Sequence, residues 1–170
     1  MSYCRIAIIG APGTGKTTLA NELSKIYNIP ATHIDGIHHL ENWKIRDKKE
    51  RDEMILKIVE KDKWIMDGTY KSTLKARLER ADLIIWLDYS TLAQVKGILE
   101  RYITNRGKEK AEIPGCKEKM DKKFFMYVLR YNKEKRKYIV DNMQGIDNNK
   151  VMIFKKRKDL NKWLKELRGD

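Results

Sequence analysis

GAPGTGKT, residues 10–17, carries every fixed position of the pattern G-x-x-x-x-G-K-[ST]. The run Arg5–Gly10 (RIAIIG) leads into it and is short, apolar and rich in β-branched residues, which is typical of a buried parallel strand. The residues that follow, Lys16–Tyr27, place Leu19 and Leu23 on one face and predict a helix. A strand that passes through this pattern directly into a helix predicts a phosphate-binding loop.

The residue types of this loop, a P-loop, suit a nucleoside triphosphate. Its glycines permit a tight turn that points N–H groups inward at phosphate oxygens, and the next helix adds its positive end. Lys16 brings a mobile positive charge to the β- and γ-phosphates, and the Thr17 hydroxyl is the expected Mg²⁺ ligand. The predicted nucleotide-binding residues of the loop are Gly10, Gly13, Thr14, Gly15, Lys16, Thr17 and Thr18.

The rest of the chain alternates strands and helices. Further strands are predicted over residues 31–35, 64–67, 83–88 and 151–154, and further helices over 47–62, 73–80, 92–105, 122–143 and around 160–167. This alternation predicts an α/β fold, with a parallel sheet between two layers of helices, in a single domain of residues 1–170. Residues 106–121 are rich in glycine, proline and charge, and we expect a loop or a small mobile lid there.

The composition limits the class of protein. The two cysteines, Cys4 and Cys116, do not form a disulfide framework and fit a reducing cytoplasm. No apolar run is long enough to span a bilayer and no signal peptide is visible, so we expect no membrane partner. The net charge of +13 favours anionic partners such as nucleotides or nucleic acid, or else reflects a solvated, lysine-rich surface.

Two predicted strands end in a carboxylate that could serve the metal side of the P-loop. Asp67 is followed by Gly68, which leaves room for phosphates, whereas Asp88 precedes a segment that resembles a helix cap. We therefore assign Asp67, together with Thr17, to the Mg²⁺ site and expect Asp88 to be structural. Asp35, at the end of the second strand, is either the general base for an acceptor or a cap of the following loop.

Three histidines lie close to Asp35 in the sequence. His33, His38 and His39 match no standard zinc spacing, and we interpret them as acceptor-pocket or ordinary loop residues. Trp43 lies in a polar loop and is a candidate for substrate contact.

Short motifs in a characteristic order extend beyond the P-loop. They are His33-Ile34-Asp35, His38, Asn42-Trp43, WIMDGTY at 64–70, Arg80-Ala81-Asp82, Arg101-Tyr102, Arg106-Gly107, and Gly115-Cys116 with Glu118. In these the chain resembles the adenylate-kinase-like group of small P-loop kinases, and more closely the bacterial DNA topology modulation proteins. The resemblance covers nearly the whole chain. It implies a P-loop NTPase three-layer sandwich with strand order 2-3-1-4-5 and a lid over the nucleotide.

The resemblance also implies site residues. Lid-region arginines clamp the phosphates in this group, and the matching positions are Arg101 and Arg106, with Arg130 and Arg136 as further candidates. The loop at 155–158, which contains Arg157, would lie near the nucleotide base. The chain departs from adenylate kinases after Asp67-Gly68, where the arginine of the AMP site is missing, and this argues against AMP as the acceptor.

The leading interpretation is an ATP-dependent phosphotransferase, a kinase that transfers the γ-phosphate of MgATP to an unidentified small molecule. The predicted catalytic residues are Lys16, Asp67, Asp35, Arg101 and Arg106, and the predicted cofactors are ATP and Mg²⁺. The alternative is a nucleotide-dependent, DNA-binding regulator of topology, which the charge allows but no DNA-binding motif indicates. A mechanical ATPase of the AAA type ranks last, because no Asp-Glu pair ends a strand.

Overall fold

A parallel sheet of five strands forms the middle layer of the computed structural model, which describes residues 3–169. The strands are β1 (Arg5–Gly10), β2 (Ala31–His33), β3 (Trp64–Asp67), β4 (Leu83–Leu87) and β7 (Val151–Phe154). They lie in the order β2-β3-β1-β4-β7, and all neighbours are parallel. Because β7 is the fifth strand of this sheet along the chain, the predicted order 2-3-1-4-5 is confirmed.

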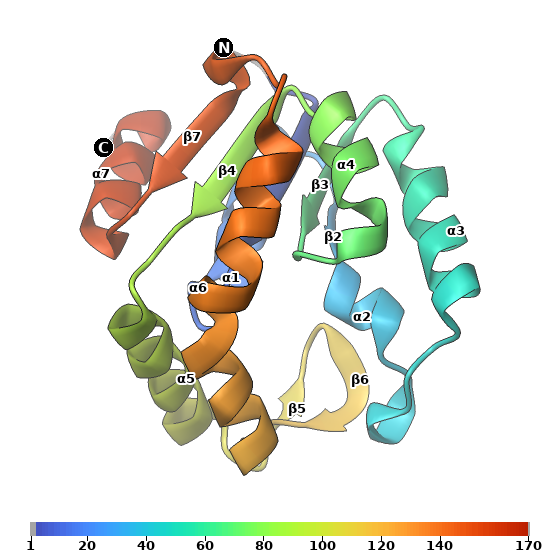
Figure 1. The fold of residues 1–170 in the computed structure, drawn as a ribbon, viewed down its shortest axis with the longest axis vertical. Coiled ribbons are helices and arrows are strands. Elements are labelled where there is room, and N and C mark those ends of the chain that lie inside the picture. Colours follow the sequence, from blue (N-terminus) through green and yellow to red (C-terminus); the bar gives the residue numbers. More distant parts are fainter. Residues whose placement is uncertain (1–2, 170) are drawn as a thin grey trace.

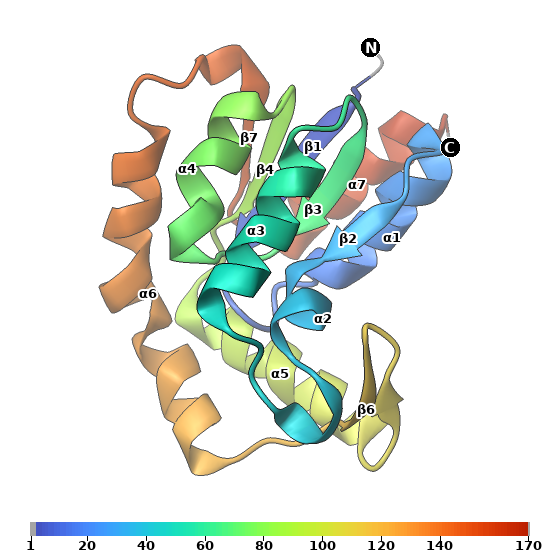
Figure 2. The same ribbon diagram turned by 90° about the vertical axis from the view of Figure 1, so that its right-hand side faces the viewer.

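Helices cover both faces of the sheet, as the alternating pattern predicted. They are α1 (Lys16–Tyr27), α2 (Ile34–His38), α3 (Lys48–Val59), α4 (Lys71–Arg80), α5 (Thr91–Asn105), α6 (Lys122–Met143) and α7 (Arg157–Arg168), with 3-10 turns η1 (Glu41–Trp43) and η2 (Asn148–Lys150). Along β1 the side chains alternate: Ile6 and Ile8 pack with α1 and α7, whereas Ala7 and Ile9 pack with α3, α4 and α6. Figures 1 and 2 show these layers from the front and from the side.

Two predicted segments differ from the structure in kind, whereas several other predicted elements differ only by one to three residues at an end. Strand β2 ends at His33, because the chain turns into α2 at Ile34; Asp35 therefore lies in the first turn of a helix and not at a strand end. Residues 106–121 are not irregular, since they contain an antiparallel hairpin of β5 (Glu109–Lys110) and β6 (Ile113–Lys117). Both differences concern the segments that surround the P-loop.

The carboxyl ends of the sheet strands face α2, α5 and the β5–β6 hairpin, in the lower half of Figure 1. In open parallel sheets this edge is where ligands bind. Within residues 3–169, no helix combines the length and apolar character needed to cross a membrane.

Candidate active site

The P-loop joins β1 to α1, and its three glycines have backbone angles that favour glycine. Gly10, Gly13 and Gly15 have φ of 149°, 78° and 89°. A Cβ on Gly10 would lie 2.8 Å from the carbonyl oxygen of Leu87, and one on Gly13 would lie 2.4 Å from that of Gln94. A Cβ on Gly15 would meet nothing within 4 Å. Gly15 therefore leaves the backbone open to a ligand, whereas the other two allow close packing.

Neighbouring elements hold the P-loop in place. Helix α5 touches it through Gly97, where an added Cβ would lie 2.0 Å from the carbonyl oxygen of Gly13. The Thr69 hydroxyl donates to the Gly10 carbonyl at 3.0 Å and accepts from the Gly10 N–H at 3.1 Å. The Tyr131 hydroxyl from α6 donates to the same carbonyl at 3.2 Å. Thr69 falls in the sequence motif DGTY, but no sequence signal points to Tyr131 or Gly97.

The polar side chains of the loop differ in exposure. Lys16 folds back over the loop, and its ammonium donates to the carbonyl of Ala11 at 2.8 Å. Burial lowers the pKa of Lys16, and the negative charge of Asp67 opposes this. Thr14 is buried and also donates to the Ala11 carbonyl, at 2.8 Å, whereas Thr18 is exposed. Lys16 is thus a charge kept partly out of water inside a loop built for phosphates.

Asp67 links two side chains at the end of β3. Its Oδ2 accepts from the Thr17 hydroxyl at 3.0 Å, and its Oδ1 lies 2.7 Å from Nδ1 of His33. Nε2 of His33 lies 3.0 Å from the amide oxygen of Asn21. Both imidazole nitrogens thus face acceptors, which favours the protonated ring. The hydrogen bond to Asp67 raises the pKa of His33, against the opposing effect of burial. No local sequence pattern indicates this pairing.

Thr17 and Asp67 fit the Mg²⁺ ion that a P-loop protein uses. Their hydroxyl and carboxylate oxygens lie together beside the phosphate loop, and hard oxygen ligands are those that Mg²⁺ prefers. Within residues 3–169 no group of three histidine, cysteine, aspartate or glutamate residues forms a metal cage. The two oxygen donors of Thr17 and Asp67 are the number expected from the protein where Mg²⁺ also takes ligands from phosphates and water.

Asp35 lies across from the P-loop on α2. Its Oδ1 accepts from the Tyr70 hydroxyl at 2.7 Å. Burial alone would raise the pKa of Asp35, but the hydrogen bond from Tyr70 and the charges of Lys16 and Lys110 outweigh it and lower the pKa. Burial and the adjoining Asp35 raise the pKa of Tyr70. Asp35 is therefore a carboxylate close enough to Lys16 for their charges to interact.

The β5–β6 hairpin is fastened to the segment that follows α2. The thiol of Cys116 accepts from the N–H of Trp43 at 3.1 Å and donates to the carbonyl of Leu40 at 3.3 Å. The ammonium groups of Lys110 and Lys119 lie 5.5 and 5.1 Å from the centre of the Trp43 ring. Trp43 thus contacts the hairpin region through its backbone N–H and through its ring.

The two arginines expected to act from the lid have different surroundings. Arg101 pairs with Glu118 at 3.0 Å, and its Nε is buried without a hydrogen-bond partner. Its charge contributes to lowering the pKa of Lys16, so the two cations lie in the same region. Arg106 is exposed at the end of α5, with its guanidinium 5.9 Å from the ring centre of Tyr102.

Two further arginines lie at either side of the sheet edge. Arg157 donates to the carbonyl of Gly13 at 3.4 Å and lies 3.9 Å from Glu100, which places it against the P-loop. Arg136 pairs with Asp88 at 3.0 Å. The Asp88 carboxylate is therefore engaged in an ion pair, in keeping with a structural role.

Fold and loop together define a P-loop nucleotide-binding protein with a kinase-like architecture. Residues 5–125 match the family model described as AAA domain, and the chain belongs to this family. No protein of curated function matches the sequence. The comparisons do not confirm the resemblance to DNA topology modulation proteins.

Three solved shikimate kinases share the fold over nearly their whole length. The enzyme from Bacteroides thetaiotaomicron is 16% identical with a TM-score of 0.61, covering 98% of this chain and 97% of the other. The enzyme from Acinetobacter baumannii, in complex with shikimate, is 14% identical with a TM-score of 0.61, covering 98% and 93%. The enzyme from Aquifex aeolicus is 21% identical with a TM-score of 0.54, covering 96% and 94%. At these identities the similarity shows the fold alone.

Proposed function

We propose that this protein is an ATP-dependent phosphotransferase that moves the γ-phosphoryl group of MgATP to the hydroxyl of a small molecule. The observation that carries the proposal is the position of Asp35. It is a carboxylate outside the nucleotide loop, yet its charge interacts with that of Lys16 inside it. A site that only hydrolysed or exchanged nucleotide would not require a second carboxylate there. The shared fold with three small-molecule kinases supports the same conclusion.

The nucleotide side uses the P-loop. The backbone from Gly10 to Gly15 and the Lys16 ammonium would hold the phosphates. Arg157, which donates to the Gly13 carbonyl, would contact the remainder of the nucleotide. Thr17 and Asp67 would hold Mg²⁺, which supplies positive charge to the β- and γ-phosphate oxygens when bound.

The acceptor side uses Asp35. Tyr70 holds Oδ1, and Oδ2 is then free to accept a hydrogen bond from the acceptor hydroxyl. In the transfer, the bond between the γ-phosphorus and the ADP oxygen breaks and a bond from the acceptor oxygen forms. The hydroxyl proton passes to Asp35. Because the pKa of Asp35 is lowered, its carboxylate is a weak base. It orients the acceptor hydroxyl and takes the proton late in the transfer of the phosphoryl group.

Residues 106–121 serve as the lid in this proposal. The hairpin reaches the acceptor side through Lys110, whose charge acts on Asp35. Arg101 lies near Lys16 and is the better placed of the two lid arginines to meet the γ-phosphate, whereas Arg106 would approach only on closure. Closure would exclude water from the transferring phosphoryl group.

The test is ADP release in a coupled assay with a panel of polyols, sugars and their phosphate esters. We expect acceptor-dependent release from the wild type. Asp35→Asn should keep MgATP affinity but lose acceptor-dependent turnover by about 10²- to 10⁴-fold, whereas Lys16→Ala should lose both. The control is Asp62→Asn, an exposed aspartate ahead of β3 at the opposite edge of the sheet. Unchanged acceptor-dependent turnover in Asp35→Asn would contradict the proposal.

A further inference from the structure

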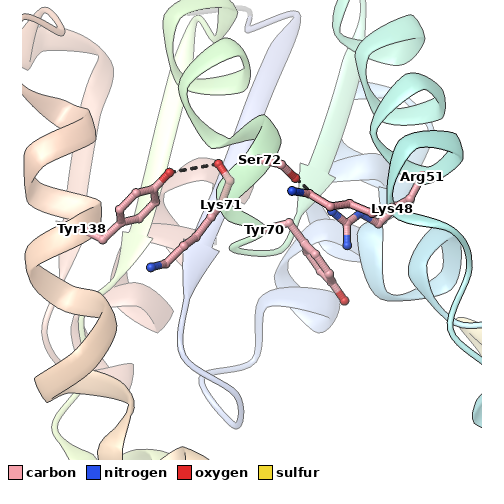
Figure 3. Close-up of a pocket in the computed structure, with 6 residues that line it drawn as sticks. All are labelled: Lys48, Arg51, Tyr70, Lys71, Ser72 and Tyr138. Atoms are coloured by element: carbon pink, nitrogen blue, oxygen red, sulfur yellow. Dashed lines mark hydrogen bonds between the residues drawn. The ribbon is translucent and has the colours of Figure 1, made fainter.

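A cavity of about 410 Å³ opens beside the acceptor side, between α3, α4 and α6. It is lined by Lys48, Arg51, Tyr70, Lys71, Ser72 and Tyr138. Figure 3 shows Lys48 and Arg51 reaching in from α3 and Tyr138 from α6, with the first residues of α4 between them. The cavity is shallow and open to solvent, and Lys48, Lys71 and Ser72 are exposed, but its volume suffices for a small polar ligand.

The cavity carries a surplus of positive charge. Arg51 is already neutralised, because its Nε and NH2 donate to Asp52 Oδ1 at 2.9 and 2.7 Å. Lys48 and Lys71, by contrast, form no ion pair with any carboxylate of residues 3–169. The Lys71 ammonium instead lies 4.5 Å from the ring centre of Tyr138. Two ammonium groups without a carboxylate match a ligand that carries two negative charges.

Helix α4 adds hydrogen-bond donors at the same place. Its N-cap residue is Tyr70, which makes no side-chain cap, so the N–H groups of the first turn have no side-chain acceptor there. Lys71 and Ser72 belong to this turn and also line the cavity. A phosphate group, with several acceptor oxygens and nearly two charges at neutral pH, meets both requirements.

Tyr70 connects the cavity to the proposed reaction centre. Its ring lines the cavity and lies 5.1 Å from the Arg51 guanidinium, while its hydroxyl donates to Asp35 at 2.7 Å. Arg51 NH1 also lies 3.3 Å from Nδ1 of His38 on α2, the helix that carries Asp35. A ligand bound in the cavity would therefore lie on one side of the Tyr70 side chain, with Asp35 at the hydroxyl end of the same side chain.

We infer that this cavity binds the phosphate group of the acceptor, so that the substrate is a phosphate monoester whose free hydroxyl, several bonds away, receives the γ-phosphoryl group at Asp35. The inference rests on the proposed function, since it names the class of acceptor for that site. It assigns Lys48 and Lys71 to the recognition of the existing phosphate, with no part in the transfer step.

The experiment compares ribose with ribose 5-phosphate as probes, by calorimetry and by ADP release. We expect the phosphate ester to bind at least tenfold more tightly than ribose, and inorganic phosphate to compete with it. Lys48→Gln and Lys71→Gln should each weaken its binding about fivefold, and raise KM with little change in kcat. MgATP affinity should stay unchanged in both variants.

The matched control is Lys57→Gln, which removes an exposed positive charge from α3 away from the cavity. An equal loss of affinity for ribose 5-phosphate in Lys57→Gln would mean that the effect comes from net charge alone, and it would overturn the inference. Wild-type affinity in both Lys48→Gln and Lys71→Gln would overturn it as well. Tighter binding of gluconate, a polyol carboxylate, than of the phosphate ester would overturn the choice of phosphate.

The two proposals fail separately. If Asp35→Asn abolishes turnover of an uncharged acceptor, and the cavity variants bind the phosphate ester like the wild type, the kinase proposal is supported and the phosphate site is refuted. If no probe stimulates ADP release, but the phosphate ester binds the wild type and not the cavity variants, the phosphate site is supported and the kinase proposal is refuted.

Discussion

Thr17 and Asp67 lie 50 positions apart in the sequence, and the Thr17 hydroxyl donates a 3.0 Å hydrogen bond to Oδ2 of Asp67. Parallel pairing of β1 with β3 brings them together, because it sets Asp67 beside Ile8, just ahead of the P-loop. The two side chains form one oxygen-rich position next to the loop that is expected to hold the phosphates.

Asp67→Asn tests this position as a Mg²⁺ site. The amide keeps the shape and one acceptor oxygen but removes the charge. The factor by which Mg²⁺ increases nucleotide affinity should therefore be about 10- to 100-fold smaller than in the wild type. Affinity in the presence of EDTA should not change. Titration of a fluorescent ATP analogue with and without Mg²⁺ measures both values. Asp88→Asn is the control, and a larger effect there would reverse the assignment of the two aspartates.

Gly97→Ala tests the contact between α5 and the P-loop. The new Cβ would lie 2.0 Å from the Gly13 carbonyl oxygen, so the loop or the helix must shift. We expect an unfolding free energy lower by about 2 kcal/mol despite the higher helix propensity of alanine, and at least tenfold weaker nucleotide binding. Lys96→Ala, at an exposed position of the same helix, should change neither value measurably. A fully stable Gly97→Ala with normal binding would contradict the packing.

Arg77→Met tests the support of the segment after β3. Arg77 is fully buried and donates to the carbonyls of Gly68 at 2.8 Å and Tyr70 at 3.2 Å; burial lowers its pKa to about 10, so it stays charged. Methionine has similar volume but no donor, which leaves both carbonyls unpaired. Urea denaturation should show a loss of about 2 kcal/mol. The same substitution at Arg80, exposed on the same helix, should be close to neutral.

Cys116→Ala tests the fastening of the hairpin. The thiol joins Trp43 and Leu40, and it holds a backbone turn in which Asn42 and Trp43 have φ of 57° and 62°. Such angles are strained for Trp43, whereas asparagine adopts them more readily. Without the sulfur, hydrogen exchange should accelerate about tenfold at residues 40–46 and 113–117. Cys4→Ala should leave these peptides unchanged, and protection that persisted in Cys116→Ala would refute the role of the thiol.

Asp82→Asn tests an electrostatic contribution far from the site. Asp82 accepts from the Arg5 guanidinium at 2.5 Å and from the Arg5 N–H at 3.0 Å. Burial alone would raise the pKa of Asp82, but these hydrogen bonds outweigh it and lower the pKa. A carboxylate with a lowered pKa stabilises the fold at pH values above its pKa in the unfolded chain, which is about 3.9. This stabilisation is lost as the pH falls through the pKa of the folded state.

The wild type should therefore exceed Asp82→Asn in unfolding free energy by about 1 kcal/mol at pH 7, and the difference should shrink below about pH 4. Urea denaturation at pH 7, 5 and 3 gives the comparison. Glu60→Gln, at an exposed position, serves as the control. A difference that did not vary with pH would mean that packing, and not charge, is responsible.

Local patterns in the sequence were sufficient for most of the fold. The segments Arg5–Gly10, Lys16–Tyr27, Trp64–Asp67, Lys122–Met143 and Val151–Phe154 have the bounds that periodicity predicted. The errors fell where local patterns are weak. β2 is an edge strand of three residues that runs straight into a helix. The hairpin of residues 109–117 contains a proline, a glycine and four charged residues, and it lacks a clear alternation.

The sequence by itself determined the phosphate loop, because glycine positions, a lysine and the flanking strand and helix are all local features. Only the tertiary structure brought His33 to Asp67, Tyr70 to Asp35 and Lys48 to Lys71. These partners come from different elements, and what places them together is the order of the strands and the packing of helices over them. A side chain's local sequence carries no record of which distant element will cover it, so the surroundings of the loop became visible only in the folded chain.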